Sequence, residues 1–141
     1  MRPVGSPKVD QFLLTMSDAT GFGTGGTTGV LTALPSATGT TCNISDPGVA
    51  FNFELPNNLQ QCRDFTFVQY TGAVQPVTIY GLIPSGDSFV LNPPLGPTDY
   101  DWTANIAART SLIMLMVDGQ GRQGGASDLL RVYVLHGTIP Y

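Results

Sequence analysis

Apolar and polar residues alternate over short distances along this chain, and no stretch keeps the spacing of an amphipathic helix. Apolar side chains never recur at i, i+3, i+4 and i+7 over several turns, and Pro or Gly interrupts most segments. Short runs rich in β-branched and aromatic residues recur instead, bounded by turn residues. This pattern predicts an all-β protein. The expected strands are residues 11–16, 28–33, 49–54, 64–70, 77–83, 88–91, 101–104, 112–117 and 129–135.

Two of these runs indicate how the strands are covered. Phe65 and Phe67 alternate with Thr66 and Val68, which is the period of a half-buried strand. Residues 112–117 are apolar without alternation, so we expect a central strand covered on both faces. Short strands joined by Pro and Gly turns favour an antiparallel β-sandwich of two sheets.

The chain contains an internal repeat. Residues 12–21 can be laid over residues 112–121 at an offset of 100, and with one residue of slack residues 25–28 fall on 124–127 and residues 30–31 on 129–130. Each copy is an apolar strand, Asp-x-x-Gly, a Gly-Gly pair and a second apolar strand, which together predict a β-hairpin.

The repeat predicts the domain organisation, because a period near 100 residues is the length of an immunoglobulin-like sandwich. Residues 1–41 are therefore interpreted as an N-terminal hairpin, the remnant of a preceding repeat, followed by a linker. Residues 42–141 are interpreted as one complete immunoglobulin-like antiparallel β-sandwich module.

The N-terminal hairpin needs cover, because a two-stranded hairpin alone is at best marginally stable in water. Phe12, Leu14, Met16, Val30 and Leu31 would form an exposed apolar face. We expect the hairpin to fold back onto the module and widen one of its sheets. The alternatives are that it adds its strands to another copy, which would be self-association through the N-terminal hairpin, or that it stays disordered.

Composition narrows the class of partner. Only 11% of residues are charged, and six basic residues against ten acidic ones give a net charge of −4. This balance offers no electrostatic footprint for nucleic acid or anionic lipid. A low charge with a surface of Thr, Ser, Gly, Asn and Gln is typical of secreted β-proteins.

Two cysteines and a sequon point to an oxidising compartment. Cys42 and Cys62 are predicted to form a disulfide, worth about 3 kcal/mol, and Asn43 begins the glycosylation sequon Asn-Ile-Ser. The alternative is two buried thiols. A metal site would need more ligands than these cysteines and the lone His136 can supply, so no metal or cofactor is expected. No signal peptide is encoded and no apolar run is long enough to span a membrane, so no membrane insertion by this chain is expected.

Motifs that could carry chemistry have simpler structural interpretations. Residues 21–26 spell G-x-G-x-x-G, but no helix follows, so a turn is expected. Asp99, Asp101 and Trp102 could form an acidic-aromatic sugar site. The favoured interpretation is a turn followed by a strand whose Trp lies in the core. No nucleophile and base occur in a recognisable arrangement, and the chain is expected not to be an enzyme.

Four segments resemble a known kind of protein: residues 58–70, 77–89, 101–104 and 110–128. They are similar to the tandem module, about 100 residues long, of uncharacterised basidiomycete fungal surface proteins. The motifs that match are Gln61-Cys62, Trp102 and the hairpin of residues 118–125. One departure is that Arg109 stands before Thr-Ser where these proteins usually have Gly, which would place a non-glycine residue in a turn that favours positive φ.

The resemblance and the residues together predict a non-enzymatic extracellular or cell-surface module of unknown ligand, with a structural or interaction role. The resemblance implies that its partner is an unknown protein or a cell-wall polysaccharide. Two alternatives remain open. One is a carbohydrate-binding or carbohydrate-active module, and the other is a truncated gene product without a selected function, which the absence of a secretory signal would fit.

Overall fold

The computed structural model describes residues 11–134, and this range contains β-strands and no helix. Every pair of named strands is antiparallel. The prediction of an all-β protein is therefore confirmed. The strands are β1 Gln11–Phe12, β2 Leu31–Thr32, β3 Asp64–Phe67, β4 Thr78–Leu82, β5 Phe89–Leu91, β6 Tyr100–Thr103, β7 Ser111–Val117, β8 Gln123–Ala126 and β9 Leu130–Arg131.

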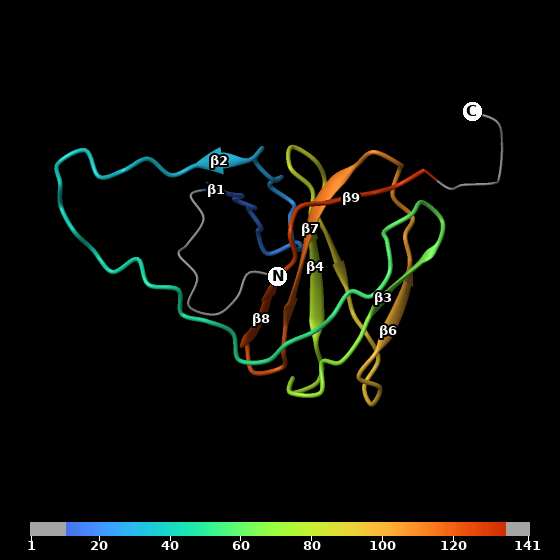
Figure 1. The fold of residues 1–141 in the computed structure, drawn as a ribbon. Coiled ribbons are helices and arrows are strands. Elements are labelled where there is room, and N and C mark those ends of the chain that lie inside the picture. The colour runs from blue at the N-terminus through green and yellow to red at the C-terminus, as the bar shows by residue number, and fades with distance from the viewer. Residues whose placement is uncertain (1–10, 135–141) are drawn as a thin grey trace.

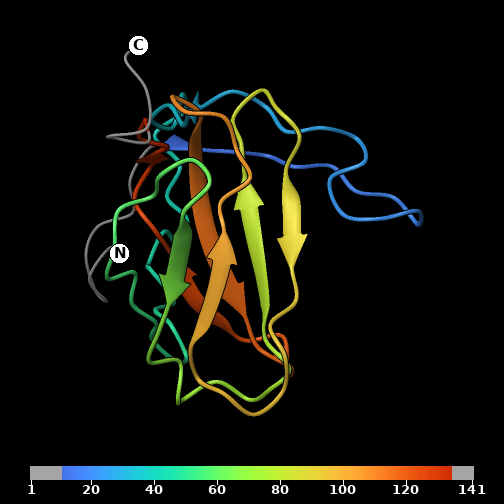
Figure 2. The same ribbon diagram turned by 90° about the vertical axis from the view of Figure 1, so that its right-hand side faces the viewer.

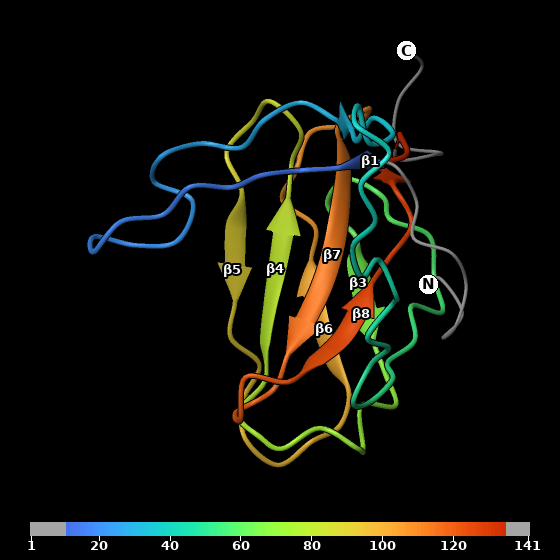
Figure 3. The ribbon, with the colours of Figure 1, turned by 90° about the vertical axis from the view of Figure 1, so that its left-hand side faces the viewer.

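The strands from β3 onward form two layers that face each other. One layer is the pair β3-β6, and the other has the order β5-β4-β7-β8, with β9 also pairing β7. Figure 2 shows β3 and β6 in front of the larger sheet, and Figure 3 shows the larger sheet from its outer side. This arrangement is consistent with a β-sandwich.

The hydrophobic core lies between the two layers. Phe65 and Phe67 point inward from β3, and Met114 and Met116 point inward from β7, all with at most 1% of their surface exposed. The rings of Phe89 on β5 and Trp102 on β6 lie 5.3 Å apart and join the layers at one edge. The full set of buried apolar residues is Phe51, Phe53, Leu59, Phe65, Phe67, Tyr70, Val77, Ile79, Trp102, Ala104, Leu112, Met114, Met116 and Val132.

Strand β7 corrects one expectation. It is central as predicted, with β4 on one side and β8 and β9 on the other. Its buried residues alternate with half-buried ones, so only one face is fully covered. The half-buried face is apolar because it carries Ile113, Leu115 and Val117, and this hid the alternation in the sequence.

Two further segments differ from the secondary structure that the sequence predicts. Residues 49–54 form no strand, although Phe51 and Phe53 are buried. Conversely, Gln-Gly-Gly-Ala is strand β8, in a stretch where no strand was expected. Glycine is required there by packing, because a Cβ on Gly124 would lie 2.4 Å from the Phe51 ring.

The N-terminal hairpin does not join either sheet of the sandwich. Strands β1 and β2 pair with each other and form a separate two-stranded sheet. The expectation that the hairpin widens a sheet of the module is therefore wrong. Figure 1 shows the hairpin beside the sandwich, with a long extended segment leading from β2 into it.

Candidate interaction surface

The N-terminal hairpin and the β7–β9 hairpin are built in the same register. In both, the first strand pairs with the second through two neighbouring residue pairs at the open end of the hairpin. The pairs are Gln11–Thr32 and Phe12–Leu31 in the first hairpin, and Ser111–Arg131 and Leu112–Leu130 in the second.

The middle of each hairpin repeats the same unusual hydrogen bonds. Leu14 N–H donates to the Thr28 hydroxyl at 3.1 Å, and Thr28 N–H donates to the Leu14 carbonyl at 2.9 Å. Met114 N–H donates to the Ser127 hydroxyl at 2.9 Å, and Ser127 N–H donates to the Met114 carbonyl at 2.7 Å. A hydroxyl residue thus replaces a backbone acceptor at the same step of both hairpins.

The turns repeat as well. Gly21 N–H donates to the Asp18 carbonyl at 3.3 Å, and Gly121 N–H donates to the Asp118 carbonyl at 3.0 Å. Thr20 N–H donates to Asp18 Oδ1 at 2.8 Å in the first hairpin. Gln120 N–H donates to Asp118 Oδ1 at 3.0 Å in the second. The glycines of residues 21–26 serve this turn, and the interpretation of that motif as a turn is confirmed.

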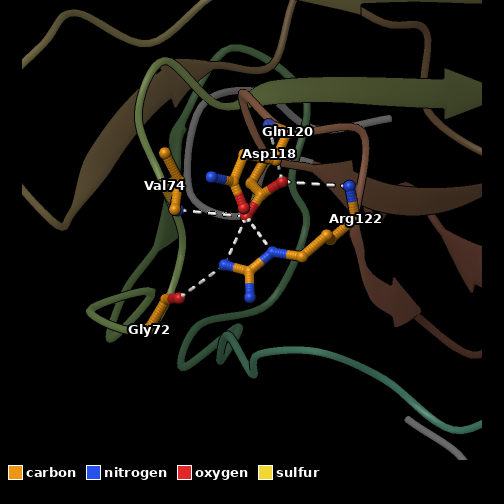
Figure 4. A network of polar contacts seen from close by, with 5 residues as sticks. All are labelled: Gly72, Val74, Asp118, Gln120 and Arg122. Carbon is orange, nitrogen blue, oxygen red and sulfur yellow. Dashed lines mark hydrogen bonds and ion pairs between the residues drawn. The ribbon is translucent and has the colours of Figure 1, made fainter.

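The second turn is clamped to the sandwich by a buried carboxylate (Figure 4). Asp118 Oδ2 accepts hydrogen bonds from Val74 N–H at 3.0 Å and from Arg122 Nε at 2.9 Å, and Oδ1 accepts the N–H groups of Gln120 and Arg122. Burial alone would raise the pKa of Asp118, but these hydrogen bonds outweigh it and lower the pKa to about 2. Arg122 also reaches the Gly72 carbonyl at 3.3 Å. The carboxylate is committed to holding the β7–β8 turn against residues 72–74.

The first turn makes a different contact at the same place. Its residue equivalent to Arg122 is Phe22, whose ring lies 4.7 Å from that of Tyr80 on β4. Asp18 has hydroxyl partners instead of a cation, and hydrogen bonds from Thr20 and Thr24 lower its pKa. The first hairpin therefore uses an aromatic side chain to contact the module that follows it in the chain.

One face of the N-terminal hairpin docks on the β4–β5 turn. The Thr27 and Ser88 hydroxyls lie 2.6 Å apart, and Ser85 N–H donates to the Thr28 carbonyl at 3.0 Å. The Thr15 side chain on the same face is half-buried and reaches Thr27 at 3.0 Å. Figure 3 shows the hairpin crossing β4 and β5 near this turn. The hairpin does fold back onto the module, by its turn and one face.

The opposite face of the hairpin is uncovered. Phe12 is 42% exposed, Leu14 57% and Met16 69%, whereas Leu112, Met114 and Met116 at the equivalent positions are fully buried. We call Phe12, Leu14, Met16 and the neighbouring Leu31 the open face. Contiguous exposed apolar surface marks interaction sites in soluble proteins, so the open face is the candidate functional site.

The predicted modification sites are accessible. Cys42 and Cys62 are exposed free thiols in the structure, so the alternative of buried thiols is wrong. The disulfide between them stays a prediction. Asn43 is exposed, and its side-chain oxygen accepts Ser45 N–H at 2.9 Å, which forms a turn at the sequon. Its glycosylation also stays a prediction.

The acidic-aromatic cluster does not form a stacking platform. Trp102 is 8% exposed and packs against Phe89. Tyr100 is half-buried, and Asp101 accepts a hydrogen bond from the Thr66 hydroxyl at 2.7 Å. Trp102 is a core residue, and the main support for a sugar site at these positions is removed.

A single buried side-chain hydroxyl, that of Tyr70, lacks a hydrogen-bond partner within residues 11–134. Burial raises the pKa of this hydroxyl, and the charge of Asp99 adds to the effect. The group is therefore neutral at physiological pH.

Metal-binding and membrane-spanning features are absent from the part of the chain that the structure describes. No group of three or more His, Cys, Asp or Glu side chains in residues 11–134 is arranged to hold a metal ion, and no helix there could cross a membrane. His136 lies outside the described residues. Comparison with family models, with curated proteins and with solved structures found no match to this chain.

Proposed function

We propose that this chain is a non-enzymatic, immunoglobulin-like β-sandwich module whose N-terminal hairpin serves protein–protein contact. The strand order supports this type of sandwich. The pair β3-β6 corresponds to strands B and E, and the order β5-β4-β7-β8 corresponds to C′, C, F and G, the order of an immunoglobulin sheet extended at its C edge. A parallel bridge between Gln60 and Tyr133 also pairs the beginning of the module with the segment that follows β9.

In this proposal the N-terminal hairpin is the closing hairpin of a preceding repeat. Its register, its hydroxyl-mediated step and its Asp turn match those of β7–β9. Such agreement at an offset near 100 residues supports tandem modules, since each module would end in this hairpin.

The observation that carries the interaction role is the exposure of the open face. Residues of the type that fill the core in β7 are 42–69% exposed on the hairpin. The proposed setting is extracellular or at the cell surface, supported by the resemblance to fungal surface proteins and by the accessible cysteines and sequon. We do not propose a sugar-binding function, because Trp102 is buried.

Deletion of residues 1–34 tests whether the hairpin is an interaction element on a self-sufficient module. Within residues 11–134, no residue of the hydrophobic core precedes Phe51, so the truncated chain should keep a cooperative unfolding transition. It should also lose most of the binding of a hydrophobic dye such as bis-ANS. If the truncated chain unfolds, or binds dye as the full chain does, the proposed role of the hairpin is wrong.

A further inference from the structure

The two hairpins differ in what lies beside their first strand. Strand β7 has β4 along one edge and β8 with β9 along the other. Residues 11–16 have the second arm of their hairpin along one edge, and no other named strand pairs with them within residues 11–134. The first strand of the N-terminal hairpin thus has a free edge where β7 has β4.

The backbone groups that face this edge can be identified. Met16 N–H donates to the Gly26 carbonyl, and the Leu14 carbonyl accepts Thr28 N–H, so residues 14 and 16 bond to the second arm. Because the hydrogen bonds of an antiparallel strand alternate between its two sides, the N–H and C=O groups of Leu13, Thr15 and Ser17 point to the free edge. They form a template for an added strand.

The β7–β9 hairpin shows which kind of strand fits such a template. On β7, Ile79 lies opposite Met116 and Gly81 lies opposite Met114. Shifted by the repeat offset, the same register would place Ile79 opposite Met16 and Gly81 opposite Leu14. An added strand of this kind would extend the sheet and cover part of the open face.

A second copy of this chain does not offer that strand. Its β4 is already paired with β5 on one edge and with β7 on the other, so no copy with an intact sandwich has a free β4. The occupant must come from a sandwich that lacks its own closing hairpin.

We infer that the N-terminal hairpin is a β-augmentation site for an extended strand of the β4 type. The strand binds antiparallel along Leu13–Ser17, with a branched apolar side chain opposite Met16 and a glycine opposite Leu14. Tyr80 and Leu82 of such a strand would point to the face opposite the open face, as they do in β4. This inference rests on the proposed interaction role and names the partner of that site.

The test uses the full chain and a synthetic peptide of residues 77–82 between two lysine pairs, labelled for fluorescence anisotropy. The chain should bind this peptide. An Ile79→Asp change in the peptide should weaken binding at least about tenfold, because a charge would face the apolar side. A matched Thr78→Asp change should weaken it far less, since Thr78 would lie opposite Ser17 and point away from the open face.

Variants of the chain locate the site. Met16→Asp should weaken binding at least about tenfold. Because Met16 is 69% exposed, the fold of the free chain should not change. Leu34→Asp is the control, since Leu34 is 83% exposed and lies beyond the paired residues. Bound peptide should also slow hydrogen exchange at the amides of Leu13, Thr15 and Ser17.

Several results would overturn the inference. These are no peptide binding, equal binding of the two Asp-containing peptides, or protection of amides elsewhere in the chain. Dimerisation that Met16→Asp abolishes and the peptide does not inhibit would show that a second copy is the occupant. If the peptide fails to bind while deletion of residues 1–34 still removes dye binding from a folded module, the occupant is wrong and the interaction role stands.

Discussion

The two hairpins of this protein have nearly the same hydrogen bonds and opposite environments. Leu14 and Met114 bond to a hydroxyl residue in the same way, yet Leu14 is 57% exposed and Met114 is fully buried. The difference lies in the neighbours, because β7 is covered by β3 and β6 and flanked by β4. Local sequence is enough to build the hairpin, whereas burial depends on strands that are distant in the chain.

The two turns also differ in the contacts they make. Arg122 binds Asp118 at 2.7 Å and ties its turn to its own module. Phe22 at the equivalent position packs against Tyr80 on β4. The two turns share the hydrogen bonds to the Asp carbonyl and Oδ1, and they use the equivalent position for different contacts.

The largest loss of stability is expected from truncating Trp102, a core residue of β6. Trp102→Ala should lower the free energy of unfolding by about 3–5 kcal/mol, because it leaves a cavity beside Phe89. Urea denaturation followed by fluorescence of the tyrosines, or by circular dichroism, measures it. Leu34→Ala, at a position that is 83% exposed, is the control. An unchanged midpoint for Trp102→Ala would contradict its place in the core.

A matched pair of substitutions tests the comparison directly. Met114→Ala should cost about 2–5 kcal/mol of unfolding free energy. Leu14→Ala should change it by no more than about 0.5 kcal/mol, because Leu14 is largely solvated and lies outside the core. Chemical denaturation of both variants decides the matter. Similar losses for the two would mean that the hairpin belongs to the same cooperative unit as the sandwich.

The chain enters β7 through a strained residue. Arg109 has a φ of 74°, in the left-handed region that favours glycine. Arg109→Gly should stabilise the module by about 1 kcal/mol, since the left-handed conformation costs a non-glycine residue about that much. Arg109→Lys keeps the strain and is the control. A less stable glycine variant would show that contacts of the Arg109 side chain outweigh the strain.

The last effect depends on pH. The pKa of Asp118 is about 2 in the folded chain against 3.8 for a free side chain, so its contribution to stability is full above about pH 4 and is lost as the pH falls towards 2. Asp118→Asn should be less stable at neutral pH and should lose less between pH 4 and 2. Asp18→Asn should leave the pH dependence of sandwich unfolding unchanged, because the core includes no residue of the hairpin. Parallel profiles for the parent and Asp118→Asn would contradict this role of Asp118.

Part of the fold could be predicted from the chain alone. Alternation marked Phe65 and Phe67 as inward-facing, and both are buried. The repeated spacing of Asp, Gly-Gly and apolar residues predicted two hairpins, and their pairing is now seen in one register. These features depend on residues close together in the sequence, where turn geometry and strand period determine the structure.

Other features were decided by tertiary structure. Gln-Gly-Gly-Ala pairs with β7 as strand β8, and Gly124 lies against the ring of Phe51, 73 positions earlier in the chain, which leaves no room for a side chain there. The clamp from Asp118 to Val74 spans 44 positions. The open face is also a tertiary property, because Leu14 and Met114 occupy equivalent positions in their hairpins and only the surrounding strands determine which one is buried. A local pattern specifies which side of a strand is apolar, but burial requires a second surface, and its position depends on contacts between residues far apart in the sequence.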